Sequence, residues 1–92
     1  MIVSSRLEAM DAIEANFEFA CGFSMTVINV FHKDLITGEI NLTDMLSHDS
    51  VQAIVWKDNY LKSLKELGVP YICYVGDHFT EASGALEFEE DK

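Results

Sequence analysis

The chain has 92 residues, a length that suits one domain, and 49% of them are hydrophobic, which is enough apolar material for a packed core. Sixteen acidic residues against six basic ones give a formal net charge of −10. Because a strongly negative surface repels phosphate, this charge argues against direct binding to nucleic acid or to an anionic membrane. We therefore expect a single domain over residues 1–92 with an acidic C-terminal end.

The start of the chain lacks the basic stretch and long apolar region of a secretory signal, and no apolar run approaches the roughly 18 residues of a membrane span. The sequence therefore predicts a cytoplasmic protein without membrane contact, in the host cytoplasm if it is phage-encoded. In that compartment we expect Cys21 and Cys73 to be reduced and buried rather than joined in a disulfide.

A helix is predicted from Ser5 to Cys21. The segment Ser5-Arg6-Leu7-Glu8 has the form of a capping box, and Gly22 is suited to a left-handed C-terminal cap. Between them an apolar stripe recurs at helical spacing, made of Met10, Ile13, Phe17, Ala20 and Cys21. Alternating apolar residues over 17–23 support a competing strand, which would end the helix near Asn16.

The middle of the chain predicts a hairpin followed by a second helix. Residues 23–32 are rich in β-branched and aromatic side chains on both alternating faces, which favours a central strand. A shorter strand over 35–42 is expected to pair with it, and 43–48 are expected to form one helical turn. Asp49 or Ser50 then caps a helix that ends at Gly68 before Pro70, with an apolar stripe of Val51, Ile54, Val55, Leu61, Leu64 and Leu67.

Residues 69–75 form the second strong strand prediction, because they are apolar on both faces and bounded by Pro70 and Gly76. A turn at 76–78 and an acidic edge strand over 85–89 follow. The predicted fold is α+β with the order αββαββ, a mainly antiparallel sheet of about four strands and two helices on one face. The alternative makes Met1 to Ser4 a strand in a ferredoxin-like βαββαβ domain, with the acidic C-terminus as an appendage.

No pattern in the sequence predicts catalysis, a cofactor or a metal site. Ser47-His48-Asp49-Ser50 places a hydroxyl, an imidazole and a carboxylate side by side, whereas a catalytic triad needs them to converge from separate segments. Asp44 and His48 could share a helical face as metal ligands, but no CxxC, HxxxH or HExxH spacing accompanies them. We interpret the segment as a helix cap or turn.

Trp56 and Tyr60 are four residues apart on the predicted second helix, off its main apolar stripe. The simpler interpretation is that they rim the core. The functional alternative is an aromatic pair at a protein interface, where tryptophan and tyrosine commonly anchor binding.

Acidic residues gather at two places in the chain. On the predicted first helix Asp11, Glu14 and Glu18 follow i, i+3, i+7 spacing, with Glu8 nearby. The C-terminal end adds a second group, namely Glu87, Glu89, Glu90 and Asp91. Acidic surface often serves only solubility, but almost no lysine or arginine is interspersed to relieve this repulsion.

These charges predict a non-enzymatic binding protein whose carboxylates occupy the phosphate positions of a basic nucleic-acid-binding partner. Phage proteins that block restriction or CRISPR machinery share this size and charge, an analogy of physical type because no motif identifies a family. One alternative is an immunity protein or antitoxin that covers a basic toxin. Another, from a different class, is a small metal-dependent or hydrolytic enzyme that uses His48 and Asp49.

Overall fold

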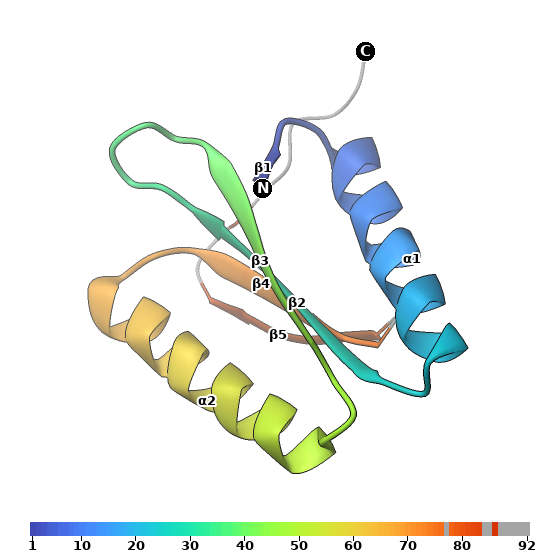
Figure 1. The fold of residues 1–92 in the computed structure, drawn as a ribbon. Coiled ribbons are helices and arrows are strands. Elements are labelled where there is room, and N and C mark those ends of the chain that lie inside the picture. Colours follow the sequence, from blue (N-terminus) through green and yellow to red (C-terminus); the bar gives the residue numbers. More distant parts are fainter. Residues whose placement is uncertain (77, 84–85, 87–92) are drawn as a thin grey trace.

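The computed structural model describes residues 1–76, 78–83 and 86. The fold is α+β, as the sequence predicts, and the described residues form two helices and five strands in the order βαββαββ. In chain order the elements are β1 (Ile2–Val3), α1 (Arg6–Gly22), β2 (Thr26–Lys33), β3 (Ile40–Ser47), α2 (Ser50–Leu67), β4 (Tyr71–Val75) and β5 (His78–Ser83) (Figure 1). The N-terminal strand belongs to the predicted alternative, and the second C-terminal strand belongs to the main prediction.

The strands form one antiparallel sheet in the order β1-β3-β2-β4-β5. The central strand β2 pairs with β3 along its whole length and with β4 from Ile28 to His32. Its residues from Val27 to Phe31 are buried, which explains why both of its faces are apolar in the sequence. The predictions of a central strand here and of β4 inside the sheet are confirmed.

The two helices pack on opposite faces of the sheet, so the prediction of both on one face is wrong, and so is the ferredoxin-like alternative (Figure 1). Successive side chains of a strand point to opposite faces, and β2 contributes to both cores accordingly. Ile28 and Val30 pack in the cluster that holds Leu61 and Leu64 of α2. Phe31 packs in the cluster of α1 instead, which also contains Val3, Ala9, Ile13, Leu42 and Leu86.

Chain connectivity gives the physical reason for this placement. β1 and β2 run parallel because both pair antiparallel with β3, and α1 connects them across β3. Likewise α2 connects β3 and β4 across β2. Both connections step the same way across the sheet but start from strands of opposite direction. Crossover connections between parallel strands are right-handed in about 98% of cases. Two right-handed crossovers that start from strands of opposite direction therefore place their helices on opposite faces.

Helix α1 begins as predicted but presents a different stripe to the core. Ser5 is the N-cap, and its Oγ accepts from Glu8 N at 3.2 Å. The buried residues of the helix are Ala9, Ile13 and Ala20, whereas Met10 and Cys21 are exposed. The left-handed position after the helix is taken by Ser24, at φ 55°, and not by Gly22. The competing strand over 17–23 and the burial of Cys21 are therefore wrong predictions.

The two thiols are expected to differ sharply in reactivity, because Cys73 is fully buried while Cys21 is exposed. In the native protein a thiol-reactive disulfide reagent should modify Cys21 at once and Cys73 only after denaturant is added. The Cys21→Ser variant serves as the control and should show no fast phase. Rapid native reaction of that variant would contradict the burial of Cys73.

The first hairpin lies further along the chain than predicted. Its turn occupies 34–39, where Asp34 Oδ1 accepts from Ile36 N at 2.7 Å and from Thr37 N at 2.9 Å. These bonds to the charged form hold the pKa of the Asp34 carboxyl below its usual value. The second strand therefore runs over Ile40–Ser47 instead of 35–42, and the predicted helical turn at 43–48 is wrong.

Helix α2 has the predicted caps. Asp49 Oδ1 accepts from Val51 N and Gln52 N, and Gly68 ends the helix at φ 70°. The buried residues are Ala53, Leu61 and Leu64, whereas the other members of the predicted stripe, Val51, Ile54, Val55 and Leu67, are exposed. No helix among the described residues is long and apolar enough to cross a membrane.

Strand β5 precedes the segment over 85–89 in which the sequence predicts an edge strand. β5 covers His78–Ser83 and pairs with β4, and Gly76 turns the chain into it at φ 67°. Apart from Leu86, the predicted edge strand over 85–89 lies outside the described residues. Leu86 is buried in the cluster beneath α1 and has no regular secondary structure.

Candidate functional site

The predicted acidic row lies on the solvent side of α1. Ala9, Ile13 and Ala20 turn one side of the helix toward the sheet. The four acidic residues of the helix, Glu8, Asp11, Glu14 and Glu18, are all exposed. At about 1.5 Å of rise per residue, the last three are spaced by about 4.5 and 6 Å along the helix axis. The structure thus brings three carboxylates into one row, whose role in binding stays a prediction.

Glu8 stands apart from this row because it is used in the helix cap. Its Oε2 accepts from Ser4 N at 3.1 Å and from the Ser4 hydroxyl. Asp11, Glu14 and Glu18 have no ion-pair partner among the described residues. Between described residues the one ion pair joins Lys57 Nζ to Asp58 Oδ1 at 3.4 Å on α2. The other predicted acidic group, Glu87, Glu89, Glu90 and Asp91, lies outside the described residues.

A polar cluster beneath α1, which no sequence pattern predicts, extends the acidic surface to the sheet. Asn16 Nδ2 donates to Asn29 Oδ1 at 2.6 Å and to Asp44 Oδ2 at 2.9 Å. Asn29 and Asp44 are cross-strand partners on β2 and β3. Asp44 is exposed, so its carboxylate joins the α1 side of the molecule rather than a metal site with His48.

Asn29 is the polar member of the core. Its side chain is fully buried, and its Nδ2 has no hydrogen-bond partner among the described residues. A buried donor without a partner costs free energy, so the Asn16 bond to its oxygen carries much of the compensation.

Asn16→Ala should therefore lower the free energy of unfolding by about 1–3 kcal/mol, because both ends of the buried Asn29 amide then lack partners. The matched test is the double variant Asn16→Ala/Asn29→Val, which removes the buried polar group and should recover part of the loss. Urea denaturation measures both variants. If the double variant is less stable than Asn16→Ala, the unpaired Asn29 amide is not the cause of the loss.

Trp56 and Tyr60 of α2 pack at the rim of the core, as the simpler interpretation expects. Their rings are stacked, with centroids 5.3 Å apart and planes 16° from parallel. Tyr60 Oη lies 3.0 Å from Thr43 Oγ1 and 3.4 Å from His32 Nδ1. Both aromatic residues are half-buried, and their use at an interface stays a prediction.

His32 beside Tyr60 makes stability depend on pH. Desolvation by burial lowers the pKa of the His32 imidazole below 6.5, against an opposing effect of Asp34. As pH falls below about 6.5 the unfolded chain takes up this proton before the folded one, so stability is lost until the folded pKa is passed. We expect His32→Gln to flatten the decline in urea midpoint between about pH 7 and pH 5. Identical slopes for both proteins would contradict this assignment.

The polar segment before α2 serves as a cap, as predicted. Ser47 Oγ accepts from Asp49 N at 3.0 Å, and Asp49 in turn caps the helix. Ser50 Oγ lies 2.8 Å from Thr26 Oγ1. The part of the chain that the structure describes contains no group of three His, Cys, Asp or Glu side chains able to hold a metal ion.

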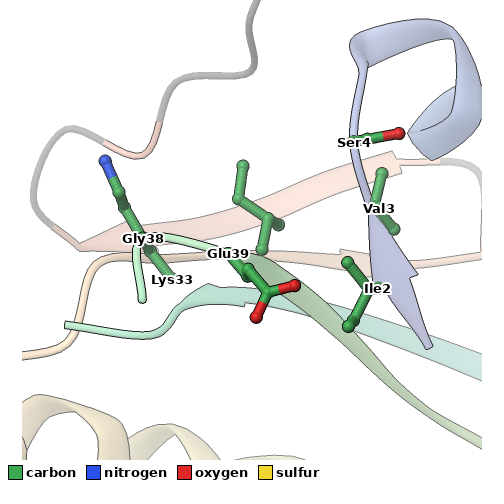
Figure 2. A pocket seen from close by; sticks show the side chains of 7 residues that line it. Ile2, Val3, Ser4, Lys33, Gly38 and Glu39 are labelled. Atoms are coloured by element: carbon green, nitrogen blue, oxygen red, sulfur yellow. The ribbon is translucent and has the colours of Figure 1, made fainter. Parts of the chain in front are cut away.

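A shallow pocket of about 260 Å³ lies where β1 meets the base of the first hairpin (Figure 2). Its charged side chains are Lys33 and Glu39, and Figure 2 shows their charged ends pointing away from one another. The two opposite charges give the pocket little net field. It therefore adds nothing to the acidic surface of α1.

Comparisons with protein-family models, with curated proteins and with solved structures return no significant match.

Proposed function

We propose that this chain is a non-enzymatic binding protein that occludes the basic nucleic-acid-binding surface of a partner protein. The carboxylates of Asp11, Glu14 and Glu18 take the places that phosphates normally occupy there. The observation that carries the proposal is that these three side chains form an exposed row with no cation beside them among the described residues. Inhibitors of the kind that phages direct against restriction or CRISPR machinery act on such surfaces.

The cost of the row supports a role beyond solubility. Like charges three or four residues apart on a helix destabilise it by about 0.2–0.5 kcal/mol per pair. Helix α1 carries four acids and a single base, Arg6, and has no basic residue in its last turn. A basic groove on a partner would turn this repulsion into attraction on binding.

The row acts mainly on the rate of association. A single exposed ion pair contributes about 0–1 kcal/mol, but several carboxylates facing one basic groove sum their long-range attraction. Such steering raises the association rate constant and is screened by salt. This protein and nucleic acid should compete for the partner, because both need the same basic side chains of its binding surface.

The test starts from a partner captured and identified from host lysate, loaded with a labelled nucleic acid. Adding the protein should displace the nucleic acid, with a midpoint that rises steeply with salt. The Asp58→Lys/Glu66→Lys variant of α2 is the control and should compete as well as the original protein. A partner that keeps its nucleic acid while it binds this protein would refute the phosphate-mimic mechanism. A captured toxin that carries no nucleic acid would favour the immunity-protein alternative.

A further inference from the structure

Strand β3 has an open edge along its second half. On its inner side β3 pairs with β2 over all eight residues. On its outer side β1 pairs only with Ile40 and Asn41, and Leu42 N donates to Met1 O at 2.7 Å (Figure 1). From Thr43 to Ser47 no strand lies on the outer side among the described residues.

The register identifies which backbone groups this edge offers. The odd-numbered residues of β2 face β4, since Lys33 N donates to Pro70 O and Val27 O accepts from Gly76 N. Its even-numbered residues therefore bond to β3, where they meet Thr43 and Met45. The alternating residues Asp44 and Leu46 point their N–H and C=O groups outward, with no strand partner among the described residues.

Helix α1 covers the face of the sheet on which the side chains of Leu42 and Asp44 lie. It begins next to β1, opposite Ile40, and ends near Thr26, which pairs with Ser47, so it runs alongside β3. Asn16 Nδ2 donates to Asp44 Oδ2, which ties the middle of the helix to this edge. Phe19 and Phe23 are 55% and 58% exposed, with ring centroids 4.9 Å apart.

We infer that the outer edge of β3 binds an extended, basic segment of the partner by strand addition, an inference that rests on the proposed function for the partner's charge. The segment exchanges backbone hydrogen bonds with Asp44 and Leu46. The residue types expected in this segment follow from the β3 side chains that it would face. A lysine or arginine lies opposite Asp44, an apolar residue opposite Met45, and another apolar residue opposite the half-buried Leu46.

Charge decides between this occupant and a second copy of the chain. Two copies that pair along β3 would bring together two molecules of net charge −10, each with Asp44 on the edge. A basic segment gains attraction from Asp44 and from the α1 row instead. Unlike a phosphate chain, it also presents the backbone donors and acceptors that an open strand edge requires.

Amide hydrogen exchange followed by NMR tests the inference residue by residue. In the free protein the Thr43 and Met45 amides should be protected, while those of Asp44 and Leu46 exchange fast. The probe is a short synthetic peptide with valine at every second position. The positions between the valines include a lysine and then a leucine, which lie on the other face of the strand. It should slow exchange at Asp44 and Leu46 at least about tenfold without changing Thr43 or Met45.

Two variants separate the backbone from the charge. Leu46→Pro removes an outward N–H that the native ladder does not use, and proline is tolerated on sheet edges. It should weaken peptide binding about fivefold or more, the effect of one lost hydrogen bond, whereas Leu46→Val should bind nearly as the original protein does. Asp44→Asn should weaken the lysine peptide but leave a peptide with glutamine in place of lysine unchanged.

Several outcomes overturn the inference. Protection of Asp44 and Leu46 in the free protein that disappears on dilution means that a second copy occupies the edge. Protection that disappears when residues 87–92 are deleted means that the chain covers its own edge. Equal binding by the Leu46 proline and valine variants removes strand addition but leaves the proposed function intact, because the α1 row is tested separately by competition with nucleic acid.

Discussion

Phe31→Ala should lower the free energy of unfolding by about 3–5 kcal/mol, and Ile28→Ala by about 2–5 kcal/mol. Both side chains are fully buried in β2, but they belong to different cores, one beneath α1 and one beneath α2. Each loss is a large share of the 5–15 kcal/mol that small domains typically have. Because the two cavities open on opposite sides of the sheet, the double variant should be nearly additive or fully unfolded.

Urea denaturation followed by circular dichroism measures these losses. Ile72 is half-buried, so Ile72→Ala should cost less than Ile28→Ala. The control is Ile36→Ala at the hairpin tip, where the side chain is 95% exposed and the change should stay within about 0.5 kcal/mol. If Phe31→Ala costs no more than the control, the cluster beneath α1 does not form a core.

Local signals located both ends of α2, the start of α1 and the strands β2 and β4. Each cap of α2 could be predicted from one residue, Asp49 at the start and Gly68 at the end. A side-chain acceptor and a left-handed backbone position each satisfy backbone groups within one helical turn. β2 and β4 are short and apolar on both faces, a pattern that only an interior strand explains.

Long-range pairing caused the errors. The residues of β3 are largely polar or half-buried, and what makes them a strand is the register with β2 rather than their own propensity. The placement of the helices on both faces follows from strand order, which no local pattern reveals. In α1, three small or aliphatic residues face the sheet, whereas Met10 and Cys21, which share the helical period, do not.

The candidate site likewise contains one part that local spacing predicts and another that depends on long-range pairing. The α1 row could be predicted because helical spacing alone places Asp11, Glu14 and Glu18 together. Asp44 could not, since its place beside α1 depends on a hydrogen bond between residues 28 positions apart in the chain. The open edge of β3 likewise depends on the shortness of β1, which pairs with only two of its residues.

Glu14→Lys/Glu18→Lys should weaken binding to the captured partner at least about tenfold, which corresponds to roughly 1.4 kcal/mol. Each reversal removes one attraction to a basic groove and adds a repulsion of similar size, and most of the change should appear in the association rate. Both side chains are exposed on α1, and lysine toward the C-terminal half of a helix is electrostatically favourable, so the fold should persist. Circular dichroism checks this before any titration.

The matched control is Asp58→Lys/Glu66→Lys, which changes the net charge by the same amount on exposed positions of α2. If net charge alone drove association, the two double variants would lose affinity equally. The phosphate-mimic mechanism instead predicts that only the α1 variant loses affinity and that its binding depends less on salt, since fewer cations of the partner are neutralised. Equal losses would reduce the carboxylate row to general electrostatic attraction, and the site would then have to lie elsewhere on the molecule.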